Sequence, residues 1–588
     1  MRSRARRHGV LLLPCELAVD ADRNGTIVMA NDNNNPNNIV GGVQLPVDVT
    51  TSAKPFQFWV NDGQNTAEDT GALTGTFATT KNYTLGTINY KADLENFARL
   101  WIYTKGLNQA IHDGTIKVGL QWENTTGTPA INVYQAVETD GGTDYLNDDT
   151  TAGNQIAGTY KTAVAQVSGT SPVVLPTSLF SNLSETAPKT YLLFEGAGVG
   201  KGKLTMVFLK SDGTTKIGEG GQVYMSLKTV SDMYEQAQVM PPGAGDIDKP
   251  YNAFPVDDSH QPPSYAPGTT PSVGWADTTS SNFEHPLDET KQFVLFVHGW
   301  NVTNGRYAQQ SQECFKRLWW QGYKGIYAAI RWPGDLTGAD QSSWWSTFSN
   351  ALDYFEIEYR GFKYAQAVKQ YTDHFNTVGY TVGVVGHSMG NILVSEALKS
   401  GGNFKYVSMD AAVSSRCYDT SSGLLLTGVT FTVPDLSSSG GYGGYFSGLT
   451  GGPVNFYNGS DPALAAWSTG NVLLKGDTDS SGKTYVFTGG VGVQLQYILS
   501  PSHPDPVYRD VFANGVTNYH ESMTMYARTR TPAMGTEAVS GSIGASLDMQ
   551  TYFPGAAAHS PQFDLNIQHG AMPCYSDVLE RLGISVGP

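Results

Sequence analysis

Residues 382–398 read Val382-Gly-Val-Val-Gly-His-Ser-Met-Gly-Asn-Ile-Leu-Val-Ser-Glu-Ala-Leu398. The first residues of this stretch form an apolar run, which predicts a strand buried on both faces of a sheet. The last residues carry apolar side chains at helical spacing. Between them lies the turn Gly386-His387-Ser388-Met389-Gly390. An apolar strand that enters a Gly-x-Ser-x-Gly turn and leaves it as a helix predicts a parallel α/β sheet with an exposed serine at the turn.

The serine of this turn is the predicted nucleophile. In such a nucleophile elbow the serine has a strained backbone, and the flanking Gly386 and Gly390 leave room for it. The Ser388 hydroxyl then lies at a helix N-terminus, whose free amides favour a developing negative charge. An ordinary strand–helix turn is the alternative interpretation. The position of the motif between a buried strand and an amphipathic helix favours the nucleophile.

A second motif lies upstream of the elbow. The apolar run Phe293–Val297 ends in His298-Gly299-Trp300-Asn301. A strand that ends in His-Gly is where this architecture carries its other oxyanion donor, so we expect the amides of Trp300 and Met389 to face one oxygen. His298 as a catalytic base is the alternative. Its position before the nucleophile contradicts the chain order serine, acid, histidine.

Together the two motifs resemble the α/β-hydrolase superfamily, and within it bacterial serine esterase or lipase-like proteins with Gly-His-Ser-Met-Gly and His-Gly-Trp-Asn segments. The resemblance covers about residues 290–588. It implies a doubly wound, mostly parallel sheet, a Ser–acid–His triad, and an acyl-enzyme formed from a small-molecule or lipid-like ester, without a cofactor. Amidase, thioesterase or acyltransferase chemistry with the same triad is the first alternative, and a catalytically inert binding protein is the second.

The acid is predicted at Asp461. It follows an alternating strand that begins at Val454, and it opens a helix. There its carboxylate would hold the Nδ1–H of the catalytic histidine. One alternative is that Asp461 serves only as the N-cap of its helix. Another is that Asp410, at the end of the preceding strand, is the acid.

The base is predicted at His559. The chain order and roles of the triad require a histidine after the acid. His559 follows a predicted last strand, Leu547–Phe553, and precedes a predicted closing helix, Cys574–Leu582. His520 is the second candidate, although its surroundings have the pattern of a helix interior. His503 and His569 remain as further candidates.

The rest of the chain divides by composition. Residues 15–240 hold short alternating stretches separated by turns, which predict an all-β, sandwich-like N-terminal domain. Residues 241–289 are rich in proline and predict a linker. Residues 1–14 are expected to be a disordered or truncated start without an evident signal peptide. Residues 290–588 form the predicted catalytic domain, with cap segments expected at Trp344–Tyr359 and 436–452.

The charge balance limits the partners. The chain has 37 Lys and Arg against 53 Asp and Glu, a net charge of −16. This excess of negative charge argues against nucleic acid or an anionic membrane as the main partner.

No apolar run is long enough for a transmembrane helix. The low share of charged residues, 15%, favours an extracellular or cell-envelope protein. The four cysteines form no metal-binding pair, and the oligomeric state stays open.

Three further stretches have two interpretations each. Asp20-Ala-Asp22-Arg-Asn24-Gly25 begins like a calcium loop, so Asp20, Asp22 and Asn24 are a candidate structural calcium site. Position twelve is Asn31 rather than glutamate, which favours an ordinary Asx-rich turn.

Residues 196–202 resemble a phosphate-binding loop, but the glycine spacing fails and we expect a hairpin loop. Trp59 and Trp101 would favour ligand binding if exposed, but we expect both in the core.

Overall fold

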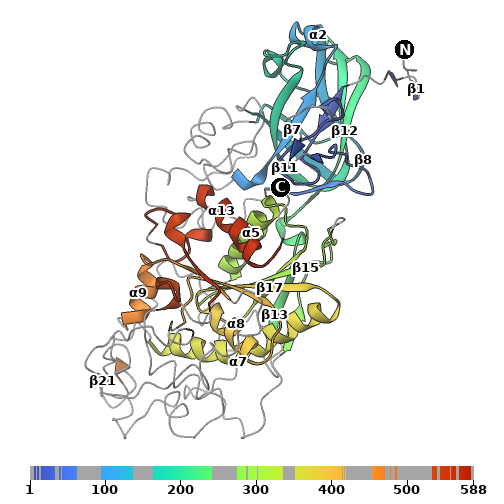
Figure 1. The fold of residues 1–588 in the computed structure, drawn as a ribbon. Coiled ribbons are helices and arrows are strands. Elements are labelled where there is room, and N and C mark those ends of the chain that lie inside the picture. Colours follow the sequence, from blue (N-terminus) through green and yellow to red (C-terminus); the bar gives the residue numbers. More distant parts are fainter. Residues whose placement is uncertain are drawn as a thin grey trace.

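The structure, a computed structural model, describes residues 6–7, 10–11, 15–32, 39–40, 43–61, 94–136, 163–240, 274–286, 289–300, 302, 304–334, 351–413, 415, 418, 453–469, 477–478, 484–485, 533–539, 543–556, 558–563 and 568–584. Two large sheets, one N-terminal and one C-terminal, organise these residues (Figure 1). The predicted cap segment 436–452 and the candidate bases His503 and His520 lie outside the described residues.

The N-terminal sheet has eight strands. They are β3 (Glu16–Ala18), β6 (Phe56–Trp59), β7 (Phe97–Tyr103), β8 (Ile116–Gln135), β9 (Ala165–Val167), β10 (Val173–Val174), β11 (Lys189–Lys210) and β12 (Lys216–Lys228). Its main path is β10-β8-β11-β12-β6, with β7 on the first half of β11, β3 beyond β7, and β9 on β8. All pairs are antiparallel except β6 with β12. The N-terminal strands therefore form one hydrogen-bonded sheet rather than the expected sandwich of two separate sheets. The reason is that β8 and β11 are long strands, which join the parts that a sandwich would separate.

The expectation of a hairpin loop at residues 196–202 is wrong. These residues lie inside β11, where its pairing with β8 has several register shifts. Glycines are needed because the two backbones come close: a Cβ on Gly198 would lie 2.5 Å from the Thr128 carbonyl oxygen, and one on Gly200 would lie 2.6 Å from that of Thr126. The hairpin is at the next turn, where the Lys210 amide donates to the Thr215 carbonyl at 2.9 Å.

The C-terminal sheet is mostly parallel. Its strands are β13 (Glu235–Met240), β14 (Gly274–Asp277), β15 (Gln292–Val297), β16 (Ile326–Arg331), β17 (Thr381–His387), β18 (Lys405–Met409), β19 (Val454–Tyr457) and β22 (Ala545–Asp548), in the order β14-β13-β16-β15-β17-β18-β19-β22. Only the pair β13–β14 is antiparallel. The sequence assigned residues 235–240 to the N-terminal β region and residues 274–277 to the linker. Both stretches extend the C-terminal sheet instead.

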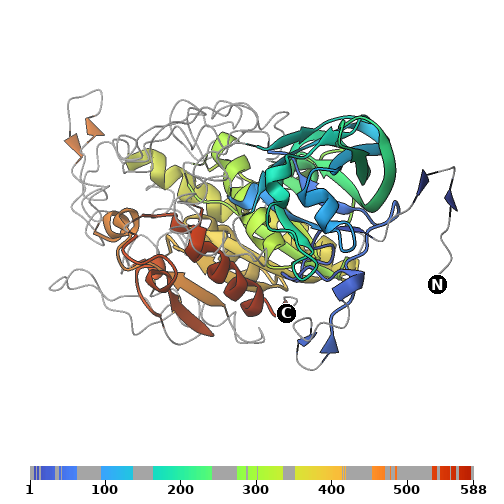
Figure 2. The ribbon, with the colours of Figure 1, turned by 90° about the horizontal axis from the view of Figure 1, so that it is seen from above.

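Helices cover both faces of this sheet (Figures 1 and 2). Helices α5 (Asn304–Trp320) and α13 (Gln568–Arg581) pack on one face, and α7 (Ala351–Thr377) and α8 (Gly390–Lys399) on the other. Strand β15 explains the two layers. Its residues Phe293, Leu295 and Val297 enter the core with α7 and α8, whereas Val294 and Phe296 enter the core with α5 and α13. A strand buried on both faces reads as a continuous apolar run for this reason.

Shorter elements complete the described chain. They are β1 (Arg6–Arg7), β2 (Val10–Leu11), β4 (Ile39–Val40), β5 (Val43–Gln44), β20 (Asp477–Thr478), β21 (Thr484–Tyr485), α2 (Asn108–His112), α9 (Pro462–Thr469), and the 3-10 turns η1 (Ala30–Asp32), η3 (Leu94–Asn96), η4 (Thr177–Phe180), η5 (Val230–Asp232), η10 (Met534–Thr536), η11 (Met549–Thr551) and η12 (Pro561–Phe563). Among the described residues, no helix is both long and apolar enough to cross a membrane.

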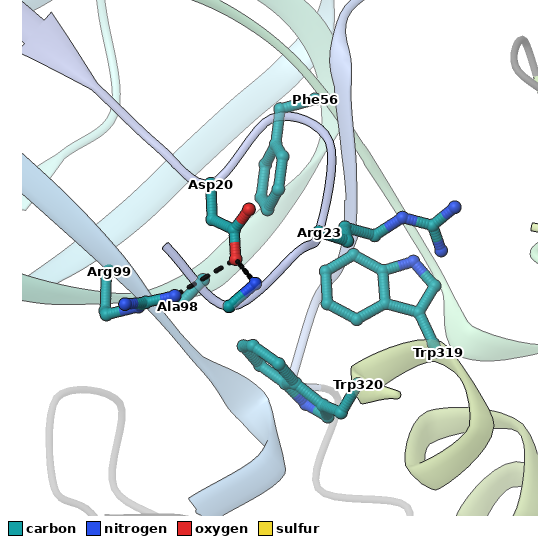
Figure 3. Close-up of a pocket in the computed structure, with 8 residues that line it drawn as sticks. Asp20, Arg23, Phe56, Ala98, Arg99, Trp319 and Trp320 are labelled. Atoms are coloured by element: carbon teal, nitrogen blue, oxygen red, sulfur yellow. Dashed lines mark hydrogen bonds and ion pairs between the residues drawn. The ribbon is translucent and has the colours of Figure 1, made fainter. Parts of the chain in front are cut away.

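The two sheets meet across α5 in one continuous apolar core. The Trp59 ring lies 5.1 Å from the Trp319 ring, edge to face, and Phe58 lies 5.5 Å from Trp319. A cavity of about 20 Å³ lies beside this contact. Figure 3 shows side chains that line it, with Arg23 over Trp319 and Arg99 paired with Asp20. That volume is on the order of one water molecule, so the interface is closely packed. Trp59 and Trp101 are both buried, as expected for core residues.

Candidate active site

The turn after β17 holds Ser388 in the left-handed region, with a φ of 52°. This conformation is uncommon for a residue with a side chain. Hydrogen bonds on both sides maintain it. The Ser388 amide donates to the Met409 carbonyl at 3.0 Å, and the Ser388 carbonyl accepts from the Ala412 amide at 3.1 Å and from Asn391 Nδ2 at 2.9 Å. The strained backbone therefore follows from its neighbours on β18 and α8.

The two glycines of the turn permit close backbone approach. A Cβ on Gly386 would overlap the side-chain oxygen of Asn391, and one on Gly390 would overlap the carbonyl oxygen of His298. Side chains at either position would push Asn391 or the end of β15 away from the serine. The Gly-x-Ser-x-Gly pattern is thus required here by packing as well as by the turn.

Three predicted side chains come together at this turn. His559 Nε2 lies 2.8 Å from Ser388 Oγ, and His559 Nδ1 lies 2.6 Å from Asp461 Oδ2. Asp461 is fully buried, and the His559 side chain keeps 27% of its surface exposed. The geometry allows Nδ1–H to donate to the carboxylate while the Nε2 lone pair accepts from the serine hydroxyl. The three residues also occur in the chain order serine, acid, histidine.

Asp461 makes the contacts that both alternatives from the sequence require. Its Oδ1 accepts from the amides of Ala463 at 2.8 Å and Leu464 at 3.1 Å, at the start of α9. Its Oδ2 accepts from His559. The helix cap fixes the carboxylate, because an N-cap oxygen must stay within bonding distance of the first-turn amides. The capping hypothesis and the acid hypothesis are therefore compatible.

The segment that carries His559 differs from the expectation in one respect. The last strand, β22, ends at Asp548 rather than Phe553, because residues 549–551 form η11. The Asp548 carboxylate accepts from the Gln550 amide at 2.9 Å and stops the strand. Asn458 Nδ2 donates to the carbonyl of Ala558 at 3.0 Å, next to His559. Sequence reasoning missed Asn458 and Gln550, although Asn458 lies three residues before the predicted acid.

Asp410, the second candidate acid, is not part of the hydrogen-bonded chain Asp461–His559–Ser388. It has a left-handed φ of 44°, and neither carboxyl oxygen has a hydrogen-bond partner among the described residues. Burial, and then the nearby charge of Asp461, raise the pKa of Asp410 well above its usual range. Both causes favour the neutral form of the carboxyl over the carboxylate.

The raised pKa makes the stability of the fold depend on pH. In the unfolded chain Asp410 ionises above about pH 3.9, whereas the folded protein retains the proton, so unfolding releases a proton and stability falls as pH rises. We expect Asp410→Asn, which is neutral at every pH, to raise Tm at pH 8 by about 2–4 °C per kcal/mol recovered, with the difference shrinking toward pH 4. Thermal unfolding followed by circular dichroism measures this. A variant that is destabilised equally at both pH values would contradict the neutral carboxyl.

Two other histidines near the serine are structural. His298 Nδ1 lies 2.9 Å from the Gly299 carbonyl, and its Nε2 accepts from the Trp332 amide at 3.2 Å. Burial lowers the pKa of His298 to about 3, so the ring is neutral and both nitrogens are occupied. The contacts of both ring nitrogens with backbone groups argue against the alternative of His298 as the base. Burial, and then the charge of His559, lower the pKa of His387 well below its usual range, and its ring packs 5.2 Å from that of His559.

The predicted oxyanion donors lie beside the nucleophile. A Cβ on Gly299 would lie 2.7 Å from Ser388 Cβ, so the chain leaving β15 passes directly against the serine just before Trp300. Met389 is the N-cap of α8, with φ −66° and ψ −22°. First-turn amides of a helix have no acceptor within the helix and are available to a ligand. The two segments that carry Trp300 and Met389 therefore meet at Ser388.

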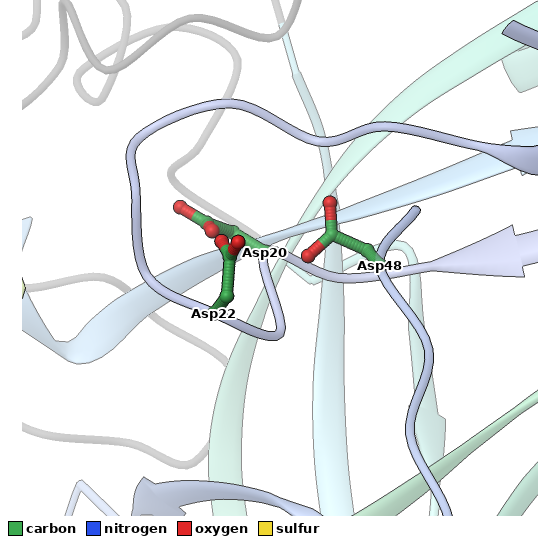
Figure 4. Close-up of side chains that lie close together, drawn as sticks. All are labelled: Asp20, Asp22 and Asp48. Carbon is green, nitrogen blue, oxygen red and sulfur yellow. The ribbon is translucent and has the colours of Figure 1, made fainter. Parts of the chain in front are cut away.

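The candidate calcium residues form an acidic cluster with a different third member (Figure 4). Carboxylate oxygens of Asp20, Asp22 and Asp48 lie within 4.8 Å of one another. The Asn24 side-chain oxygen accepts from the Thr26 amide at 2.8 Å instead of joining the carboxylates. Asp20 accepts from the Gly25 amide at 2.9 Å and pairs with Arg99 at 3.0 Å. These bonds fit the Asx-rich turn, and calcium binding stays a prediction.

Neither a protein-family model nor a curated protein matches the chain. The case for a function therefore rests on the geometry around Ser388. Of the remaining candidate bases, His569 lies in α13, at residues 568–581, and its side chain is outside the part of the chain that the structure describes.

Proposed function

We propose that the C-terminal part of this chain is a serine hydrolase of the α/β-hydrolase type, which cleaves carboxylic esters through an acyl-enzyme on Ser388. One observation carries the proposal: a single histidine, His559, lies 2.8 Å from the serine oxygen and 2.6 Å from a buried carboxylate. A nucleophile, a base and a group that orients the base are the minimum for this chemistry.

The first half of the reaction forms the acyl-enzyme. His559 Nε2 takes the proton of Ser388 Oγ as the oxygen attacks the ester carbonyl carbon. The negative charge moves to the carbonyl oxygen, which accepts from the backbone amides of Trp300 and Met389. As the tetrahedral intermediate collapses, the bond to the leaving oxygen breaks and His559 returns the proton to it. The alcohol leaves, and the acyl group stays on Ser388.

The second half repeats these steps with water. His559 takes a proton from the water molecule that attacks the acyl carbon, and returns it to Ser388 Oγ when the new intermediate collapses. The products are the carboxylic acid and the free serine. Asp461 stays ionised throughout and stabilises the imidazolium that forms twice in each cycle. Its burial strengthens this interaction, because charges interact more strongly where water is excluded.

The ester preference comes from the family resemblance of the two motifs. The same relay supports amidase, thioesterase and acyltransferase chemistry, which differ in the leaving or accepting group. A small-molecule or lipid-like ester is the proposed substrate class. An extracellular or cell-envelope location is proposed from the low charge content of the chain, 15%.

Two measurements on the full chain test the proposal. A fluorophosphonate probe should label the protein, and mass spectrometry should find the label on Ser388, because only an activated serine attacks such a probe. A panel of p-nitrophenyl esters with short, medium and long acyl chains, together with a thioester and an anilide, should give the highest kcat/KM with an ester. Absence of labelling would support an inert binding domain, and preference for the anilide would support an amidase.

A further inference from the structure

One buried arginine joins the N-terminal sheet to the segment that carries His559. Arg317, in α5, has no exposed side-chain surface. Its Nε donates to Glu95 Oε1 at 2.9 Å, and its Nη1 donates to the carbonyl of Gln562. Glu95 belongs to η3, directly before strand β7 of the N-terminal sheet, and Gln562 belongs to η12. A single guanidinium thus contacts the N-terminal part and the residue three positions after His559.

The contact belongs to a buried ionic cluster. Arg317 Nη2 also lies 3.4 Å from Glu313 Oε2, and Glu313 Oε1 accepts from Lys316 Nζ at 3.2 Å. Burial, and then the charge of Glu313, raise the pKa of Glu95 to about 7, and the charges of Arg317 and Lys316 oppose this shift. Trp320 Nε1 donates to the backbone carbonyl of Glu95 at 3.0 Å, so α5 holds both the side chain and the backbone of that residue. Removing one member of a buried ion pair is strongly destabilising, because the other charge is left without compensation.

The network reaches His559 through one short turn. The Phe563 amide donates to the Ser560 carbonyl at 3.0 Å, which closes the turn between His559 and the carbonyl held by Arg317. The Phe563 ring packs 5.1 Å from the His387 ring. On the other side of His559, Asn458 Nδ2 holds the carbonyl of Ala558 at 3.0 Å. The backbone is therefore held by a side-chain donor on each side of His559, Asn458 before it and Arg317 after it.

A general base must stay within about 2.6–3.2 Å of the atom that it deprotonates. A displacement of about 1 Å by a remote change can lower the rate about 100-fold. We propose that Arg317 and Glu95 are positioning residues: the N-terminal sheet supplies Glu95, which orients Arg317, and Arg317 holds the 558–563 segment so that His559 faces Ser388. This inference rests on the proposed function of that site.

The inference assigns a role to the N-terminal part. The Trp59 ring of this part packs 5.1 Å from the Trp319 ring of α5. This contact keeps Glu95 next to α5. The N-terminal sheet is then required for the alignment of the base, in addition to any ligand that it binds. Arginine suits position 317 because its three separate nitrogens each face a different acceptor, whereas lysine would have to reach all three from one nitrogen atom.

Four variants of the full chain test the inference, two of them controls. Arg317→Lys keeps the charge but cannot hold all three acceptors, and Glu95→Gln removes the charge of the N-terminal partner. Arg99→Lys is the matched control for the first, since Arg99 is buried and pairs with Asp20 in the N-terminal part. Glu195→Gln is the matched control for the second, since Glu195 is buried and bonds to Asn132 at 3.1 Å and Tyr134 at 2.9 Å.

With a p-nitrophenyl ester, we expect Arg317→Lys to lower kcat by about 10- to 100-fold and Glu95→Gln by about 3- to 10-fold, with KM nearly unchanged. Both controls should retain kcat within about 2-fold, even where they lower Tm. Hydrogen–deuterium exchange of residues 558–563 should rise in the two test variants and stay at the wild-type level in the controls.

The outcomes separate this inference from the proposed function. An active wild type whose kcat and exchange are unaffected by Arg317→Lys and Glu95→Gln overturns the inference alone. Equal losses in the test variants and their controls also overturn it, because they would reflect general destabilisation. A wild type without ester turnover and without fluorophosphonate labelling overturns the proposed function. It also removes the catalytic purpose of the positioning by Arg317 and Glu95. Exchange in residues 558–563 then still decides whether Arg317 and Glu95 hold the segment.

Discussion

Ser388→Ala should lower kcat for a p-nitrophenyl ester by a factor on the order of 10⁵–10⁶, and it should abolish fluorophosphonate labelling. The physical reason is that Ser388 Oγ, 2.8 Å from His559 Nε2, is the atom that forms the bond to the acyl group, so the covalent pathway is lost. Loss of the nucleophile alone removes nearly all that the triad contributes, because the three residues act as a unit. KM should change little, since the serine hydroxyl adds little to ground-state binding.

Ser408→Ala is the matched control for this variant. Ser408 is a buried serine on β18, and its hydroxyl bonds to Asn455 Oδ1 at 3.1 Å rather than to the relay. Its removal should cost about 1 kcal/mol of stability and leave kcat within about 2-fold of the wild type. Substantial turnover by Ser388→Ala, measured with a sample free of other esterases, would contradict the proposed function.

Asp461→Asn should lower kcat about 10⁴-fold with a smaller effect on KM. The asparagine amide donates where the carboxylate accepts, so His559 would adopt the tautomer with its proton on Nε2 instead of Nδ1. Nε2 could then no longer accept the proton of Ser388. The folded structure should persist, because the remaining carbonyl oxygen of the side chain can still accept from the amides of Ala463 and Leu464 at the start of α9.

Asp410→Asn provides the comparison that decides between the two candidate acids. Burial and the charge of Asp461 raise the pKa of the Asp410 carboxyl well above the usual range, which favours its neutral form. Replacement by an amide therefore changes no charge in the site, and kcat should stay within a few-fold of the wild type. If Asp410→Asn gave the larger loss of kcat in steady-state assays, Asp410 rather than Asp461 would be the acid.

Several features of the site were predictable because their causes lie within a few residues. The left-handed φ of Ser388, 52°, follows from the Gly-x-Ser-x-Gly turn between a strand and a helix. The alternating burial of Phe293–Val297 on two helical layers follows from its continuous apolar run. Asp461 was predictable from its position at a helix N-terminus after a strand. Chain order then left few histidines for the base.

Other predictions failed where a local pattern has two outcomes. The glycines of residues 196–202 suit a hairpin loop, but they also suit two strands in close contact, and the long strand β11 uses them in the second way. The alternation in residues 547–553 fits a strand throughout, but the Asp548 side chain caps a 3-10 turn and ends the strand early. Strand β13 was assigned to the N-terminal region because alternation does not indicate which sheet a strand joins. Strand β14 was assigned to the linker because of the proline-rich composition around it.

The sequence by itself determined the strand–serine–helix turn, the apolar layers of the parallel sheet, and the chain order of the three reactive residues, because backbone preferences and side-chain periodicity act over a few residues. Only the tertiary structure decided which distant groups meet. His559 and Ser388 are 171 positions apart, and Arg317 and Glu95 are 222 positions apart. Such pairs depend on how two sheets pack around α5, and packing is determined by shape and buried charge across the whole core.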